Sequence, residues 1–281
     1  MIDPKDCLIV TCLFGSKWSV LYPAMKEYRC VIFSNNPKTE KEAIKKGWEF
    51  KLVKRFLPLS NDFLESRLQG KYTKFLEFLY DFNEYRKYSF ITHIDHKNVI
   101  NSNEFERLRS LFEPTKKIFM ISSRAGCSVS ETLTNGCNTF ESYRLHEKET
   151  RSWIQSQVDS GLASWDGQEY ACSFIMYKNY DSILPFLKQV YDRLWILRQP
   201  HCQAIWAVMI QSNLDELQLQ YIHWTETSMF RRTPLPIKQE IKRTVRKLVR
   251  KAITPIFNIF GVDYEKFRKS FIIQIFGAGI K

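Results

Sequence analysis

The stretch YSFITHIDHKNVI, residues 88–100, decides the fold. Its apolar run, rich in β-branched and aromatic residues, reaches Asp95, and Lys97 follows two positions later. A short run of this kind that ends in polar groups is typical of a buried strand. Ligands of open α/β sheets collect at the carboxyl ends of the strands, so Asp95 is a candidate site residue. The alternative is that Asp95 caps the following helix or pairs with a nearby lysine.

The chain before this stretch predicts three further strands. Residues 7–14 form an apolar run that ends at a Gly15 turn, and residues 30–33 form a second run followed by polar turn residues. A charged helix over 38–46 and an alternating strand over 48–53 come next. This order favours a parallel α/β sheet. The single Gly15 is neither a dinucleotide fingerprint nor a P-loop.

Residues 61–87 predict a long helical stretch that is broken near Gly70. Apolar residues at helical spacing should face the core: Phe75, Leu76, Leu79 and Phe82. Arg67, Lys71 and Lys74 lie on the polar side, where the alternative to a site is a solvated helix face.

The second half of the body continues the alternation of helices and strands. The pattern predicts a helix over 103–111, a strand over 117–123 and an irregular loop over 124–138. A charged helix over 140–160 should end at Gly161 as its C-terminal cap, before a turn at 166–167. A strand over 170–177 and helices over 183–195 and 201–214 complete the body.

Composition limits the class of protein. The 281 residues are 44% hydrophobic and 15% aromatic, which suffices for a substantial core, and no apolar run reaches the length of a membrane span. The N-terminus lacks the pattern of a signal peptide. Seven scattered cysteines without a CxxC pair favour a reducing compartment over a disulfide framework or a zinc site.

The formal net charge of +12 is concentrated at the C-terminus, because residues 231–281 hold 13 Lys plus Arg and 3 Asp plus Glu. The charge divides the chain into a body, 1–230, and a basic segment, 231–281. Within that segment, residues 237–252 place apolar side chains on one face and cations on the rest, which predicts a basic amphipathic helix. We expect residues 237–276 to bind an anionic membrane surface. The alternatives are docking on the protein's own core or binding of another partner, nucleic acid included.

Four ordered stretches resemble a glycosyltransferase-like family that includes the plant TOD and MUCI-type proteins. They are Phe33-Ser34-Asn35-Asn36 at a strand end, the helical stretch from Arg67 to Leu79, Ile94-Asp95-His96-Lys97, and the strand at 169–177 followed by Gln203. The resemblance runs from about Asp6 to Asn213. It implies a GT-A-like, Rossmann-type mixed sheet flanked by helices, which binds a nucleotide sugar.

The resemblance also implies roles for single residues. Asp95 stands where the metal-binding Asp-x-Asp motif of GT-A enzymes begins, but Lys97 replaces the second carboxylate. Either Asp95 holds Mn²⁺ or Mg²⁺ with other oxygens, or Lys97 acts as the substitute cation on the diphosphate. The implied nucleotide-sugar-binding residues are Phe14, Gly15, Ser34, Asn35, Asn36, Arg67, Lys71, Asp95, Lys97 and Gln203.

The implied catalytic carboxylates are Asp95, Glu169 and Asp166, the last two with turn and surface positions as the alternative. The sequence departs from the family at His201-Cys202-Gln203, where Arg-Asp-Gln is expected. His93 and His96 are expected to be structural, since they flank Asp95 on alternate faces of a strand.

The expected activity is transfer of a hexose from a nucleotide sugar, with UDP as the nucleotide, to a lipid-linked or cell-surface glycan. The expected setting is a bacterial cytoplasm, peripheral to the inner face of the cell membrane, with no nucleic acid as partner. A non-catalytic α/β binding or scaffold protein at a membrane is the alternative, with Cys202 marking a decayed site.

Overall fold

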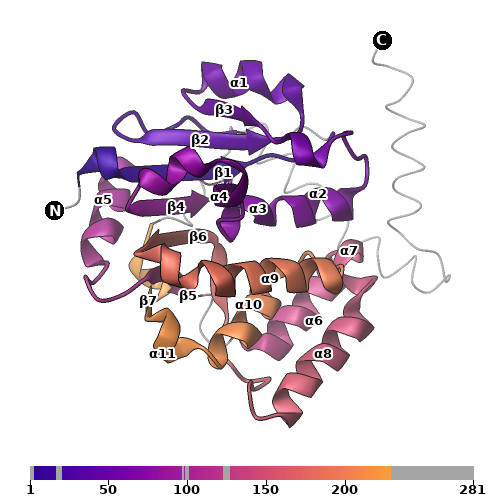
Figure 1. Ribbon diagram of the computed structural model, residues 1–281. Helices are drawn as coiled ribbons and strands as arrows, with labels where there is room; N and C mark the ends of the chain where they lie inside the picture. The colour runs from indigo at the N-terminus through magenta and orange to yellow at the C-terminus, as the bar shows by residue number, and fades with distance from the viewer. Residues whose placement is uncertain (1–2, 17–20, 97, 99–100, 123–126, 229–281) are drawn as a thin grey trace, which may run out of the picture. The chain divides into compact units, whose positions relative to one another are not determined.

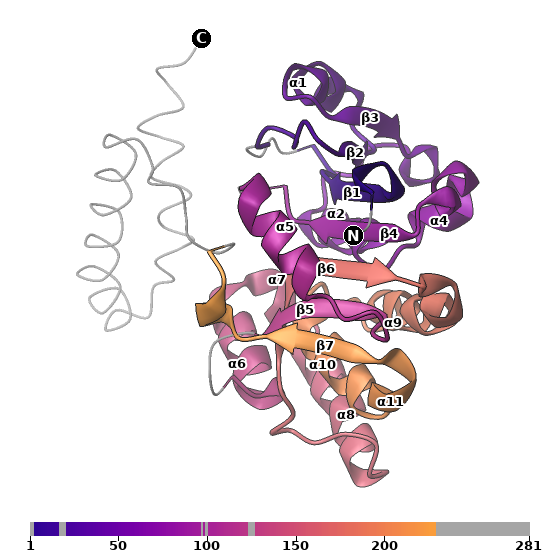
Figure 2. The same cartoon turned by 90° about the vertical axis from the view of Figure 1, so that its left-hand side faces the viewer.

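A seven-stranded mixed sheet forms the centre of the computed structural model, which describes residues 3–16, 21–96, 98, 101–122 and 127–228. The strand order is β3-β2-β1-β4-β6-β5-β7, and Figure 2 shows the strands stacked in this order. Only β6 runs antiparallel to its neighbours, so the predicted fold class, a mixed α/β sheet flanked by helices, is confirmed. The strands are β1 (Cys7–Cys12), β2 (Arg29–Ser34), β3 (Glu49–Leu52), β4 (Phe90–Ile94), β5 (Ile118–Ser122), β6 (Tyr170–Lys178) and β7 (Leu219–Ile222).

The two faces of the sheet bury separate apolar clusters, because neighbouring residues of a strand point to opposite sides. Leu8 and Val10 of β1 pack in one cluster, while Cys7 and Ile9 pack in the other. The first face is covered by α2 (Phe63–Gln69), α3 (Lys71–Lys74), α4 (Phe78–Asp81), α9 (Leu184–Ile196) and α10 (Cys202–Gln211) (Figure 1). The second is covered chiefly by α1 (Glu40–Lys45) and α5 (Ser102–Leu111).

A satellite layer lies beside this core. The helices α6 (Val129–Thr139), α8 (Glu147–Asp159) and α10 share a small apolar cluster that includes Leu133, Ile154 and Ala207. Two short helices, α7 (Glu141–Arg144) and α11 (Leu214–Leu217), complete the described helical layer. No helix within the described ranges is both long enough and apolar enough to cross a membrane.

The topology fixes where a ligand would bind. Strand β1 is paired with β2 on one side and with β4 on the other, so the direction of winding reverses between β1 and β4. In open α/β sheets the crevice outside the carboxyl ends at this switch point is the usual ligand site. Because β6 is antiparallel, its first residues lie at the same edge, and the Asp95 N–H donates to the Ser173 carbonyl at 2.9 Å.

The long helical stretch predicted over 61–87 is three short α-helices, α2 to α4, followed by the 3₁₀ helix η4 (Asn83–Lys87). The predicted break at Gly70 is confirmed, since α2 ends at Gln69 and α3 begins at Lys71. A second break follows at Leu76, which takes a left-handed backbone conformation with φ 56°. The predicted core residues are confirmed: Phe75, Leu76 and Leu79 are buried, and Phe82 packs against the core.

The prediction of an irregular loop over 124–138 is wrong for its second half, which is helix α6. Ser128 accepts from the Glu131 N–H, and the Glu131 carboxylate accepts from the Ser128 N–H, so a complete capping box begins this helix. Strand β7 was also not predicted, since LQYI is too short to stand out. The single helix predicted over 140–160 is two helices, α7 and α8, and Gly161 after α8 is left-handed. The other predicted strands and helices within the described residues occur close to the predicted ranges. The predicted segment 231–281 lies outside the described residues.

Candidate active site

Hydrogen bonds of Ser34, Asn35 and Asn36, three predicted site residues, connect the ends of β1 and β2. The Gly15 N–H donates to Asn35 Oδ1 at 2.9 Å, and Asn36 Nδ2 donates to the Gly15 carbonyl at 3.2 Å. The Ser34 hydroxyl donates to the Leu13 carbonyl at 2.5 Å. Gly15 has φ +92°, and a Cβ there would lie 2.3 Å from Ser66 Oγ, so the turn requires glycine.

Asn35 holds this loop rather than facing a ligand. Its side chain is fully buried, and Nδ2 donates to the Phe56 carbonyl at 3.2 Å and to Gln69 Oε1 at 3.1 Å. Both amide hydrogens and the Oδ1 acceptor are therefore engaged inside the protein. Phe14 is also buried and contacts the Phe56 ring edge-on, with centroids 5.3 Å apart.

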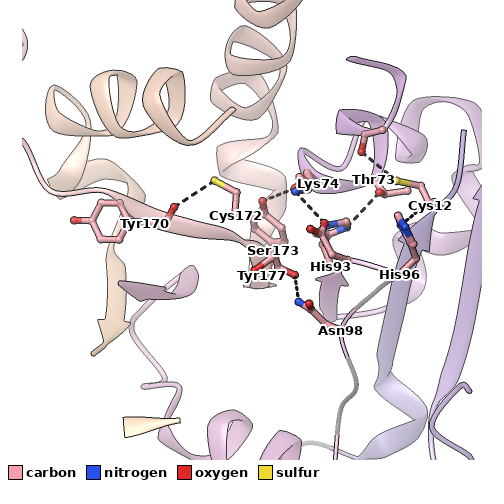
Figure 3. A network of polar contacts seen from close by, with 12 residues as sticks. Cys12, Thr73, Lys74, His93, His96, Asn98, Tyr170, Cys172, Ser173 and Tyr177 are labelled. Carbon is pink, nitrogen blue, oxygen red and sulfur yellow. Dashed lines mark hydrogen bonds and ion pairs between the residues drawn. The ribbon is translucent and has the colours of Figure 1, made fainter. Parts of the chain in front are cut away.

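Asp95 follows β4 directly, and two side chains contact its carboxylate. Lys74 Nζ lies 3.0 Å from Asp95 Oδ1, and His93 Nε2 lies 3.2 Å from the same oxygen. Figure 3 shows Lys74, Thr73 and His93 gathered at this point. Of the alternatives for Asp95, pairing with a nearby lysine is what the structure shows.

The protonation states of these partners follow from their surroundings. Burial opposes the charged form of Lys74, but the Asp95 carboxylate outweighs it and raises the pKa of the ammonium above its usual value. Burial lowers the pKa of His93 to about 4, so the imidazole is neutral at pH 7. With Asp95 ionised, His93 Nε2–H donates to the carboxylate, and Nδ1 accepts from the Thr73 hydroxyl at 3.2 Å. His93 is thus structural, as predicted.

Arg67, Lys71 and Lys74 do not form a solvated helix face. Lys71 is 9% exposed and Lys74 is 8% exposed, although lysine is almost never buried without a partner. Lys74 has Asp95, whereas no carboxylate within the described ranges pairs with Lys71 or Arg67. The structure therefore places two cations without a described carboxylate partner beside this site.

Arg67 is held by aromatic rings. Its guanidinium lies 4.2 Å from the ring centroid of Phe63, 4.6 Å from that of Phe140 and 5.0 Å from that of Tyr143. Cation–π contacts of this kind fix the position of a charge without neutralising it. Arg67 Nη1 is buried and has no acceptor in the described part of the chain, which leaves a donor for an anion.

The amino end of α10 lies beside these cations. His201, next to the first residue of this helix, is 6% exposed and stacks on Tyr143 with ring centroids 4.6 Å apart. Burial lowers the pKa of His201 to about 4, and its Nδ1 has no partner among the described residues. Helix α10 begins without a side-chain cap, so its first N–H groups add positive potential to the same place.

Cys202 stands where the predicted resemblance would place an aspartate. A hydrogen bond from the Cys172 thiol, followed by the Lys71 and Lys74 ammonium groups, holds the pKa of Cys202 well below its usual range in spite of burial. Burial raises the pKa of Cys172. The position therefore keeps an ionisable group that can carry the negative charge.

Glu169 and Gln203, two predicted site residues, are in contact through a hydrogen bond. Glu169 is 4% exposed; it accepts a hydrogen bond from the Thr132 hydroxyl at 2.5 Å and another from Gln203 Nε2. Glu169 directly precedes β6 and lies four residues before Ser173, the residue that pairs with Asp95. At the usual rise of a strand, Glu169 is about 13 Å along the chain from that pairing. Asp166 is exposed in the preceding turn, away from this contact.

A divalent metal does not fit the described residues around Asp95. The Lys74 ammonium is already bound to Oδ1, and an ammonium repels the cation that Mn²⁺ or Mg²⁺ would bring. No three side chains of the metal-ligating types form a group in the described ranges. Lys97, the predicted substitute cation, lies outside the described residues, so the cofactor question stays a prediction.

Sequence reasoning placed Lys74 on the polar face of its helix but missed its contact with Asp95, and it missed Cys172 and His201 as contributors to this site. Lys74 had a signal, because it stands three residues after Lys71 and seven after Arg67, on one helical face. Cys172 had no such signal, since its contact with Cys202 depends on how α10 packs on β6.

No family model matches the chain, and no curated protein matches it. Solved structures with a similar arrangement include mouse xyloside xylosyltransferase 1, 9% identical over 78% of this chain and 84% of that chain, with a TM-score of 0.39. The mannosyltransferase Ktr4p from S. cerevisiae is 8% identical over 78% of this chain and 68% of that chain, also with a TM-score of 0.39. A CMP:2-keto-3-deoxy-manno-octonic acid synthetase in complex with CTP is 11% identical over 88% of this chain and 98% of that chain, with a TM-score of 0.39. Similarity at this level assigns no activity to the chain, and the TOD/MUCI-type family stays a prediction.

Proposed function

We propose that this chain is a glycosyltransferase that moves a hexose from a nucleotide sugar, UDP-linked, to a lipid-linked or cell-surface glycan. The observation that carries the proposal is the pair of cations, Arg67 and Lys71, which have no carboxylate partner in the described residues. Lys71 directly follows Gly70, whose carbonyl accepts a hydrogen bond from the Cys12 thiol at the carboxyl end of β1. Cations in fixed positions beside the N-terminus of α10, which has no side-chain cap, can bind the diphosphate of such a donor.

The chemistry required of such a site is mainly electrostatic. When the bond between the sugar and the diphosphate breaks, negative charge grows on the departing phosphate oxygen. Arg67 and Lys71 would neutralise that charge from fixed positions, so little reorganisation is needed as it forms. Asp95, held in place by Lys74, would accept hydrogen bonds from donor hydroxyl groups.

A glycosyl acceptor must also lose a proton from its hydroxyl group. Glu169 is the proposed base, because it is a buried carboxylate that hydrogen bonds from Thr132 and Gln203 hold in a fixed position. The acceptor hydroxyl must come within about 3 Å of Glu169 for this transfer. Lysine and arginine, rather than Mn²⁺ or Mg²⁺, would supply the positive charge in this scheme.

The test is donor binding and turnover with matched lysine variants. UDP, GDP and CMP are titrated into the full chain by calorimetry, and release of UDP is followed from UDP-glucose, UDP-galactose and UDP-N-acetylglucosamine. Lys71→Met should weaken nucleotide diphosphate binding at least tenfold. Lys38→Met removes a lysine that is exposed in the structure and should change binding less than twofold. Equal affinities for wild type and both variants, or no binding of any nucleotide, would refute the proposal.

The location at the inner face of the membrane is part of the same proposal and concerns residues 237–276. Their cations would attract an anionic leaflet, each contributing on the order of 1 kcal/mol. Vesicles containing phosphatidylglycerol should carry the protein upward in a flotation gradient, and vesicles of neutral phosphatidylcholine should not. Replacing Lys242, Arg243, Arg246 and Lys247 together by glutamine should abolish flotation and leave UDP binding unchanged. Flotation that survives this replacement would count against the membrane role.

A further inference from the structure

A groove lies outside the cluster of Arg67 and Lys71. The 3₁₀ helix η3 (Lys54–Phe56) and the last turns of α9 enclose an open groove of about 460 Å³. This volume lies within the ~300–1,000 Å³ range of small-molecule sites. The groove is lined by Arg55, Phe56, Tyr191, Asp192, Trp195 and Ile196.

Both charged groups in this groove are already neutralised. Arg55 pairs with Asp81 at 3.1 Å and with Glu77 at 3.5 Å, and Asp192 pairs with Lys188 at 3.0 Å. The groove therefore offers hydrogen-bonding groups of both kinds without a net positive charge to attract a phosphate. In this it differs from the cluster at Arg67 and Lys71.

The rest of the lining is aromatic. Trp195 contacts Tyr191 edge-on, with ring centroids 6.2 Å apart, and the Arg55 guanidinium covers the Phe56 ring at 5.1 Å from its centroid. Rings beside ion-paired polar groups suit a molecule with C–H faces and many hydroxyl groups.

The groove is connected through Phe56 to the loops at the ends of β1 and β2. Phe56 lines the groove, its carbonyl accepts from Asn35 Nδ2 at 3.2 Å, and its ring packs on Phe14. A molecule in the groove would therefore lie next to the loops that close the ends of β1 and β2.

We propose that this groove binds a neutral oligosaccharide, as the subsite for the glycan acceptor. The inference rests on the proposed function for its role in transfer, while the binding itself rests on the groove alone. The neutralised ion pairs favour an uncharged ligand, and the aromatic walls favour sugar rings over a flexible apolar chain.

The test measures binding of four neutral trisaccharides, maltotriose, mannotriose, xylotriose and chitotriose, to the full chain by saturation-transfer NMR and fluorescence titration. At least one should bind, and Trp195→Ala should weaken that binding tenfold or more. Ile196→Glu gives a second variant that leaves the core intact, because Ile196 is 68% exposed. Trp224→Ala is the matched control, since Trp224 is 38% exposed and does not line the groove.

The outcomes separate the groove from the donor site. UDP binding should be unchanged in Ile196→Glu and weakened in Lys71→Met, with trisaccharide binding showing the reverse. If no trisaccharide binds, or if neither groove variant weakens binding, the inference is overturned. It is also overturned if Ile196→Glu abolishes UDP binding, because the groove would then hold the nucleobase. Failure of the proposed function appears differently, as trisaccharide binding without any nucleotide binding.

Discussion

Two lysines three residues apart should respond to the same substitution with opposite signs. Lys71 and Lys74 are equally buried, at 9% and 8% exposure, but only Lys74 has a carboxylate partner. Lys71→Met is expected to leave the free protein as stable as wild type or more stable. Lys74→Met is expected to destabilise it clearly.

The magnitudes follow from what each change leaves behind. Lys74→Met strands the Asp95 carboxylate, whose side chain is 18% exposed, so the cost lies near the lower end of the range for a broken buried pair, about 3 kcal/mol. Lys71 is a buried cation that has lost hydration without gaining a carboxylate partner. Its replacement by methionine should therefore raise the free energy of unfolding by about 0–2 kcal/mol. Cys202, the ionisable neighbour of Lys71, can take up a proton when Lys71 is absent.

Urea unfolding at pH 7 measures both changes, and UDP connects them to function. A ligand at 100 times its Kd adds about 2.7 kcal/mol to the stability of the wild type. At the same UDP concentration Lys71→Met, with binding at least tenfold weaker, should keep at most about 1.4 kcal/mol of this increment, although its free form is stable. Destabilisation of Lys71→Met by about 3 kcal/mol, or a full UDP increment in that variant, would refute the reasoning that Lys71 is kept for an anionic ligand.

Three further changes test single contacts. Burial lowers the pKa of His201 from 6.5 to about 4, so between these pH values the unfolded chain takes up a proton that the folded protein does not. The free energy of unfolding should therefore decline by about 3 kcal/mol for this group as pH drops from 6.5 towards 4. Urea unfolding of His201→Gln should show a shallower decline than that of the wild type. Cys202→Asp should change the free energy of unfolding by no more than about 1 kcal/mol, because Lys71 and Lys74 lie near this position. Cys30→Asp should lower the free energy of unfolding by at least about 3 kcal/mol, because burial there raises the thiol pKa to about 12. Gly136→Ala should destabilise by about 1–3 kcal/mol in thermal unfolding despite the better helix propensity of alanine, since the new Cβ would lie 2.5 Å from the His201 ring.

The sequence predicted the elements of the fold where local patterns coincide with tertiary structure. The apolar runs that became β1, β2 and β4 are buried on both faces, so they stand out as continuous runs. The loop assigned over 124–138 failed because glycine and polar residues hid a helix whose capping box, Ser128 with Glu131, was overlooked. The break at Leu76 could not be predicted, because a left-handed leucine has no local signature.

The site was predictable as a set of positions but not as a set of contacts. The strand-end rule placed Asp95 correctly, because topology alone decides which edge of the sheet it occupies. Which cation meets Asp95 depends on how α3 packs against β4, and the structure shows Lys74 in that place. The burial of Lys71 and the pairing of Glu169 with Gln203 likewise depend on long-range packing.

The contact between Lys74 and Asp95 gives a direct test of metal dependence. An ammonium 3.0 Å from Oδ1 both screens the carboxylate and excludes a second cation from that oxygen. Lys74→Gln removes the charge but keeps a hydrogen-bond donor, so the Asp95 carboxylate becomes available as an oxygen ligand. In unfolding measurements with 1 mM Mn²⁺, wild type should show no stabilisation, and UDP binding should be the same with and without EDTA. Lys74→Gln should be stabilised by Mn²⁺, whereas Lys38→Gln should behave as wild type. Stabilisation of the wild type by Mn²⁺, lost in Asp95→Asn, would show that the metal displaces Lys74 and that the lysine is no substitute for it.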